Sequence, residues 1–161
     1  MKKKLDSYSE TLYHLITFRC RQYVDSRLMI GIDYDTFMIL SCVGSHYLTH
    51  NTTKGSDWDS VWLQTRTRKM NDHYSKKKLT IYAVANIMDM PKETVRRKVE
   101  LLKKKKLIIY SSKMGLIPTD KVEETIKPFA KKELVELSIF LQSLNKNKTL
   151  DQLLNLKNKD L

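Results

Sequence analysis

The sequence has little of the two residues that most often interrupt regular structure. Only four glycines and three prolines occur in 161 residues. An all-β sandwich needs many tight turns built from these residues, so their scarcity argues against that architecture and favours long helices. Cysteine is scarce as well, and Cys20 and Cys42 are too few for a disulfide framework. We therefore expect a mainly helical, intracellular protein with reduced thiols.

Long apolar runs are missing too. The basic cluster in MKKKLDSYSE at the start of the chain is not followed by the apolar stretch of a secretory signal. No segment approaches the roughly 18 consecutive apolar residues that a transmembrane helix needs. We expect a cytoplasmic protein with no membrane partner.

The sequence also lacks the common motifs of enzymes and of cofactor sites. It has no Gly-rich phosphate loop and no nucleophile elbow, and its carboxylates are scattered. Cys42, His46 and His50 fall on one helix face, but the first and last are roughly 12 Å apart along the axis, too far for one ion. We predict no enzymatic activity, no cofactor and no metal site. A thiol sensor at either cysteine stays an alternative, because two arginines flank Cys20 and favour its thiolate.

Negative charge is in short supply, and the positive surplus is uneven. The chain has 30 Lys and Arg against 18 Asp and Glu, a net charge of +12. Between Lys76 and Lys121 there are 13 basic and four acidic residues, a net charge of +9. Charge of one sign gathered in one segment raises the local potential and attracts a polyanion. Nucleic acid is the first candidate, because an anionic membrane would need a helix with its apolar face free for lipid.

The two ends of the chain are predicted to form helices that hold a homodimer together. From residue 7 to residue 29 the apolar residues recur every three or four positions, and Asp6 or Ser7 can cap the helix start. Apolar groups cover more than one side of this helix, which favours packing on two sides, one of them against a second subunit. Residues 131–154 add a second apolar pattern at helical spacing, and a polar tail follows.

Between these ends we expect a central helix and an insertion. Gly31 breaks the first helix, and Asp33 or Asp35 then caps a strongly apolar helix suited to the core. The chain thus divides into N-terminal helices at 1–50, an insertion loop or short helix at 51–75, a third segment at 76–121, and a C-terminal helix with a polar tail at 122–161. The insertion carries Trp58 and Trp62, which we expect to contact the body or a partner.

The third segment, residues 76–121, begins with two helices joined by a tight turn. Thr80 can cap a short helix, and Asp89-Met90 forms the turn after it. Pro91 fits the first position of the next helix, where its missing N–H costs nothing. That helix, at 91–105, turns Val95, Val99 and Leu102 inward and shows Lys92, Arg96, Arg97 and Lys103 on its other face.

A hairpin is predicted directly after these helices, at 107–118. Leu107 to Tyr110 form one strand, residues 111–115 the turn, and Leu116-Ile117 the return strand. The order helix, tight turn, helix and hairpin is that of a winged helix-turn-helix. We therefore predict a mainly α fold, with a three-helix core and a short β-hairpin, flanked by N- and C-terminal dimerisation helices.

Three stretches resemble MarR-type bacterial transcription regulators. GIDYDTFMIL resembles the family's second helix, LTIYAVANIMDMPKETVRRKVELLKKKKLI its helix-turn-helix, and IPTDKVEETI the passage from wing to last helix. The resemblance extends over about residues 12–141. It implies a homodimer that binds pseudo-palindromic DNA and pairs through its first and last helices. It also implies control by a small anionic or phenolic effector, or by thiol oxidation.

The chain departs from this family pattern at four places, one of which is the insertion from Asn51 to Ser75, longer than the family's usual connection. Asp89 and Lys106 stand where the family usually has glycine, and aspartate tolerates the left-handed conformation better than most residues. The wing turn, Ser111 to Gly115, lacks the family's acidic-plus-arginine cluster. A shorter wing is expected to reach less deeply into the minor groove.

The predicted recognition helix fits the major groove. From Pro91 to Lys104 it is roughly 21 Å long, and the groove is about 12 Å wide. The N-terminal turns of such a helix meet base edges, and an arginine fork matches guanine O6 and N7. The candidate base readers are Lys92, Glu93, Thr94, Arg96 and Arg97. The candidate backbone contacts are Thr80 and Tyr82, the flanking Lys76, Lys77 and Lys78, and Lys113 at the tip of the wing, which meets the backbone or the minor groove.

These features predict a sequence-specific, double-stranded-DNA-binding transcription regulator. Two alternatives stay open. One is a plasmid or phage replication or partition factor built on the same module, which would bind repeated sites near an origin. The other is a winged-helix protein-interaction module whose basic face is only solvated and whose insertion holds a protein partner. The salt dependence of DNA affinity separates the two DNA-binding hypotheses from the protein-interaction module, because neutralising phosphates makes affinity fall steeply with salt.

Overall fold

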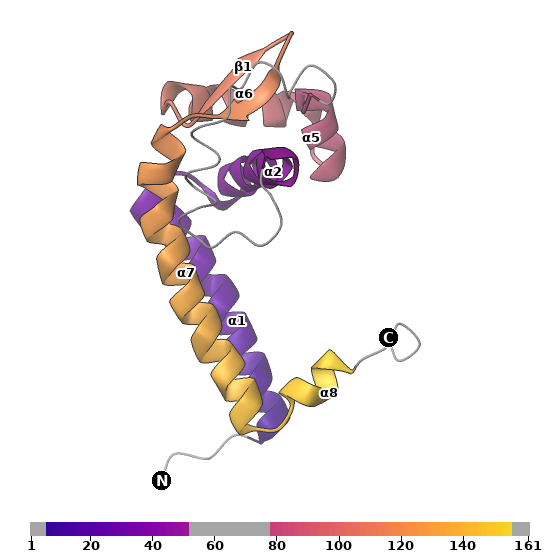
Figure 1. The fold of residues 1–161 in the computed structure, drawn as a ribbon, viewed down its shortest axis with the longest axis vertical. Helices are drawn as coiled ribbons and strands as arrows, with labels where there is room; N and C mark the ends of the chain where they lie inside the picture. The colour runs from indigo at the N-terminus through magenta and orange to yellow at the C-terminus, as the bar shows by residue number, and fades with distance from the viewer. Residues whose placement is uncertain (1–5, 52–77, 156–161) are drawn as a thin grey trace. The chain divides into compact units, whose positions relative to one another are not determined.

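The computed structural model describes residues 6–51 and 78–155 (Figure 1). They form a mainly α-helical protein in which a two-stranded antiparallel hairpin follows the helices. The described residues fall into two compact units. One takes its residues from 1–31 and 128–161, and the other spans 32–127. The predicted insertion at 51–75, apart from its first residue, lies outside the described part of the chain.

The first unit begins with α1, Ser7–Asp25. Asp6 is its cap, since the side chain accepts hydrogen bonds from the backbone N–H groups of Tyr8 and Ser9 at 3.1 and 3.0 Å. The helix continues as a π-helical turn, η1, over Ser26–Ile30. It ends at Gly31, whose φ of 71° is left-handed. The predicted cap and the predicted break are both confirmed, and the helical segment runs one residue further than expected.

The rest of this unit comes from α7, Lys121–Lys146, and the short α8, Leu150–Leu154. From Pro128 onward α7 lies beside α1 (Figure 1). Polar contacts join the two helices along their length. They are the ion pair of Arg21 with Glu136, the 2.7 Å pair of Lys132 with Asp25, and the 2.6 Å bond from Gln22 to Glu133. Just after α7, Asn147 donates to Glu10 at 2.9 Å.

The second unit holds most of the buried apolar residues. Its elements are α2 at Tyr34–Asn51, α5 at Ile81–Ile87, α6 at Lys92–Lys104, β1 at Ile108–Ser111 and β2 at Gly115–Pro118. The core side chains include Ile39, Val43, Val84, Leu107, Ile108, Leu116 and Ile117. The predicted inward face of α6 is confirmed, because Val95, Val99 and Leu102 have no exposed surface. Asp33 caps α2, accepting from the Thr36 N–H at 2.9 Å.

Helices α5 and α6 are each followed by a residue with a left-handed backbone conformation. Asp89 has a φ of 49° and Lys106 a φ of 60°. After each, a backbone N–H reaches back five residues, from Met90 to the Ala85 carbonyl and from Leu107 to the Leu102 carbonyl, both at 3.0 Å. This is the bonding of a Schellman motif, which normally favours glycine at the left-handed position. Asp89 therefore adopts the conformation that the sequence predicted for it.

The hairpin is tied to the segment before α5. Its strands pair from Ile108 with Pro118 to Ser111 with Gly115, so each lies within a residue of its predicted place. The Leu116 N–H donates to the Leu79 carbonyl at 2.8 Å, which adds the stretch before α5 to the edge of the hairpin. Gly115 has a φ of 76°, and a Cβ there would lie 2.5 Å from the Leu79 carbonyl oxygen. Only glycine fits this close approach.

No single helix among the described residues is both long and apolar enough to cross a bilayer. The segments Ser7–Ile30 and Tyr34–Leu48 reach that length and composition only when they are taken together across the break between them.

Candidate nucleic-acid interface

Helix α6 separates its apolar and charged residues onto opposite faces. One face carries the buried valines and Leu102, and packs toward α2, α5 and β1. On the other face, Lys92, Glu93, Arg96 and Arg97 are exposed, while Thr94 is half-buried. Four of the five predicted base readers are thus open to solvent, and all five lie in the first two turns of α6. A surface of this kind can present several donors at once to the edges of base pairs.

Two of these residues are joined to each other. The Glu93 carboxylate accepts from Arg96 Nε at 2.8 Å and from Arg96 Nη2 at 2.6 Å, so the pair is bidentate. The hydrogen bonds from Arg96, together with the positive charges of Arg96 and Arg97, hold the pKa of Glu93 below its ordinary value. Glu93 is therefore ionised at neutral pH, and it offsets one charge of this basic surface. Among the described residues, Arg97 makes no hydrogen bond or ion pair.

Lys98 has a different role from its neighbours, which the sequence did not reveal. Its side chain is only 18% exposed and reaches the start of α2, where Nζ lies 2.7 Å from Asp33 and 3.6 Å from Asp35. Partial burial raises the pKa of Asp33, but the hydrogen bonds from Lys98 and Thr36 outweigh it, and the pKa lies below its ordinary value. Lys98 thus anchors α6 to the body of the unit, and its charge is neutralised there.

The lysines at the end of α6 also differ from one another. Lys103 Nζ contacts both carboxylate oxygens of Glu100, at 3.0 and 3.1 Å. Lys104 and Lys106 are exposed. Cations near a helix C-terminus complement its dipole in any protein, so this end carries less information about DNA than the first turns do.

The predicted backbone contacts flank the same helix. Thr80 caps α5 and accepts from the Ala83 N–H at 3.1 Å, which leaves its hydroxyl proton available for a phosphate. Tyr82 is 63% exposed on the first turn of α5. Lys113 is exposed in the wing turn, and Lys78 Nζ donates to the Ser112 carbonyl of that turn at 3.0 Å. Lys76 and Lys77 lie outside the described residues.

The thiols and histidines do not form a site in the described part of the chain. No group of three or more His, Cys, Asp or Glu is placed there to hold a metal ion. The His50 side chain lies outside the described residues. Burial raises the pKa of the Cys42 thiol, which disfavours the reactive thiolate. Cys20 is exposed on α1.

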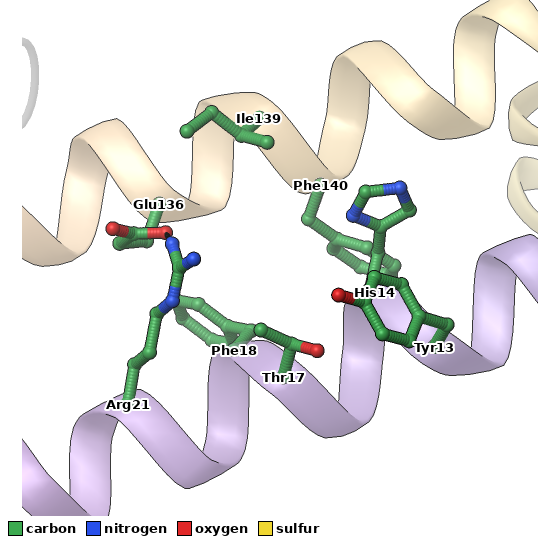
Figure 2. Close-up of a pocket in the computed structure, with 8 residues that line it drawn as sticks. All are labelled: Tyr13, His14, Thr17, Phe18, Arg21, Glu136, Ile139 and Phe140. Carbon is green, nitrogen blue, oxygen red and sulfur yellow. Dashed lines mark hydrogen bonds and ion pairs between the residues drawn. The ribbon is translucent and has the colours of Figure 1, made fainter.

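A small cavity lies between α1 and α7 in the first unit (Figure 2). Its volume is about 150 Å³, room for a few water molecules or a very small ligand. The walls are Tyr13, His14, Thr17, Phe18, Arg21, Glu136, Ile139 and Phe140. Arg21 and Glu136 pair with each other at one end (Figure 2), so an anion would meet an arginine whose charge is already neutralised. This cavity gives no support to an effector site for anions.

A comparison with protein-family models, curated protein sequences and solved structures finds no match to this chain.

Proposed function

We propose that this protein is a winged helix-turn-helix regulator of transcription that binds double-stranded DNA in a sequence-specific way. Helix α6 enters the major groove with the residues of its first two turns, and the wing, β1 and β2, meets the backbone or the minor groove. One observation carries this proposal. The exposed face of α6 presents Lys92, Arg96 and Arg97 together, while its opposite face is buried in the core of the unit.

The surroundings of α6 support the same function. Helix α5 packs against it through the Asp89 turn, and the hairpin follows directly. Tyr82 and the Thr80 hydroxyl lie at the start of α5, where the first helix of such a motif meets the phosphate backbone. Lys78 and Lys113 place two further cations at the wing. Phosphates on both sides of a groove would therefore meet positive charge or hydrogen-bond donors.

The proposal includes a homodimer held by α1 and α7. Both helices keep large apolar side chains exposed in a single chain, which is unusual unless a partner covers them. These residues are Tyr8, Leu12, Tyr13, Ile16, Tyr23 and Val24 on α1, and Leu134, Val135, Ile139 and Leu141 on α7. Two copies would present two recognition helices to the two halves of a palindromic site.

DNA affinity measured against salt tests this function. We expect steep salt dependence on random duplex, and tighter binding to the DNA upstream of the gene. With six phosphates neutralised, the slope of log affinity against log salt is about −5. Arg96→Ala/Arg97→Ala should abolish the preference for the upstream DNA. The matched control is Arg19→Ala/Arg27→Ala, which removes two exposed arginines of the first unit and should retain the preference.

Three results would contradict the proposal in different ways. Steep salt dependence without any sequence preference would indicate an architectural role. A preference for repeated sites near a replication origin, with none for promoters, would favour a replication or partition factor. Absence of binding at low salt would make the basic face a solvated surface and would leave a protein partner as the target.

A further inference from the structure

The Glu93–Arg96 pair fixes the arginine by one defined edge of its guanidinium. Glu93 accepts from Nε at 2.8 Å and from Nη2 at 2.6 Å. These two nitrogens share the side edge of the group, so Nη1 and the outer N–H of Nη2 stay unused by Glu93. Both side chains are more than half exposed, at 53% for Arg96 and 64% for Glu93. The arginine is thus held in place while its terminal edge remains open to solvent.

The open edge has the geometry that guanine recognition needs. Guanine presents two acceptors, O6 and N7, in the major groove, and an arginine fork meets both with parallel N–H groups. The Nη1–Nη2 edge of Arg96 supplies two such donors. A long, unrestrained arginine loses rotamer freedom when it binds, whereas one already held by a carboxylate loses less. Arg97 is adjacent and exposed but has no such partner among the described residues.

We propose that Glu93 is a positioning residue that commits Arg96 to reading a guanine and keeps it from phosphate. This inference rests on the proposed function, because it assumes that α6 lies in the major groove. The carboxylate acts in two ways. It orients the guanidinium, and its negative charge repels phosphates and weakens binding to DNA of any sequence. The specificity of the surface therefore depends on an acidic residue as well as on the cations around it.

The same helix supplies a matched control. Glu100 and Lys103 form an ion pair with the same three-residue spacing, two turns further along α6. The ammonium of Lys103 is a compact charge and, unlike a guanidinium, has no planar edge that a carboxylate could orient. The pair lies in the C-terminal half of the helix. Glu93→Gln and Glu100→Gln each remove one negative charge that attracts Arg96, but only Glu93 accepts hydrogen bonds from the Arg96 guanidinium.

The experiment begins with a DNA site selected by the wild-type protein from a random duplex library. Wild type, Glu93→Gln and Glu100→Gln are then titrated on that site and on random duplex over a range of salt. Circular dichroism checks that each variant is folded. A third DNA carries 7-deazaguanine, which lacks N7, at each guanine of the site in turn.

The inference predicts a specific pattern. Glu93→Gln should lose about tenfold of the preference for the selected site, the size of one bidentate base contact. Its affinity for random duplex should rise, and its salt slope should steepen by about 0.9 as Arg96 moves to a phosphate. Glu100→Gln should keep the preference within about twofold. At one guanine, 7-deazaguanine should lower the affinity of the wild type about tenfold. The same change should lower the affinity of Glu93→Gln only slightly, because Arg96 no longer reads that guanine.

Several outcomes would overturn the inference. An unchanged preference for the selected site in Glu93→Gln would do so. An equal loss of that preference in Glu100→Gln would do so as well, because the net charge of α6 would then explain the loss. A loss of preference in Glu93→Gln, with no 7-deazaguanine position that costs the wild type affinity, would make Glu93 itself the base reader, since carboxylates accept from cytosine N4. A wild type that selects no site would overturn the proposed function together with this inference, whereas the first three results leave that function standing.

Discussion

The two units of the protein hide their apolar residues to very different degrees. In the described part of the second unit, most large apolar side chains of α2, α5, α6 and both strands are buried, although Leu48, Tyr82, Ile87, Leu101, Ile109 and Tyr110 are exposed. In the first unit, α1 contributes no buried apolar residue and α7 few, and both keep large apolar groups exposed. The second unit therefore has a core of its own, whereas the first presents a surface suited to a partner.

The largest expected effect is on the core of the second unit. Leu102→Ala removes a fully buried side chain and should lower the free energy of unfolding by about 2–5 kcal/mol. The same change at Leu134, which is half exposed on α7, should cost under about 0.5 kcal/mol in a single chain. Urea denaturation at a protein concentration low enough to keep the chains monomeric measures both. Equal losses at the two positions would contradict the contrast between the units.

The next effect concerns the proposed homodimer. Ile16→Glu places a charge within the exposed apolar surface of α1, and it should weaken association by about a hundredfold or more. Sedimentation at micromolar concentration should give about twice the 19.0 kDa of one chain for the wild type, and one chain for the variant. Leu154→Glu on α8 is the control and should stay dimeric. A monomeric wild type would refute the dimer.

A smaller effect is expected where α6 is anchored to α2. Lys98→Met removes the partner of Asp33 and should cost about 1 kcal/mol, because water screens the half-exposed carboxylate. The lowered pKa of Asp33 gives the sign of the pH dependence. This contribution is complete above the ordinary value of 3.8 and is lost as the pH falls through the lower folded value. The free energy of unfolding, measured with urea at several pH values, should fall less on acidification in Lys98→Met than in the control variant Lys103→Met.

The smallest effect is expected at the wing. Lys78 donates to the Ser112 carbonyl, and its ammonium keeps two further donors for a phosphate. Lys78→Met should make the salt slope on random duplex shallower by about 0.9 and lower the affinity a few-fold. Lys131→Met, an exposed lysine of the first unit, should leave the slope unchanged. An unaltered slope for Lys78→Met would show that Lys78 is not part of the proposed DNA interface.

Much of the local structure in both units could be predicted from the sequence because local rules determine it. The caps at Asp6 and Thr80, the break at Gly31 and the buried stripe of α6 each follow from residue type and spacing within a few positions. The π-helical turn at Ser26–Ile30 was not predicted, since its bonding differs from an α-helix by only one residue in the pairing.

The candidate site was harder to predict because similar residues have different roles in it. Lys98 belongs to the same basic run as Arg96 and Arg97, yet it turns inward to Asp33, which is 65 residues away in the sequence. Only the tertiary fold brings these two together. The Glu93–Arg96 pair could be expected from the local sequence, because opposite charges three residues apart meet on a helix surface. That spacing was visible in the sequence, but the bidentate geometry was not.

Binding of duplex DNA by the exposed face of α6 is the central claim, and amide chemical shifts test it most directly. The isotope-labelled protein would be titrated with a duplex that it selects. The account predicts that the largest shifts fall on residues 92–97, with smaller ones at the start of α5 and in the wing turn, and that α1 changes little. Large shifts elsewhere with none on residues 92–97 would contradict it.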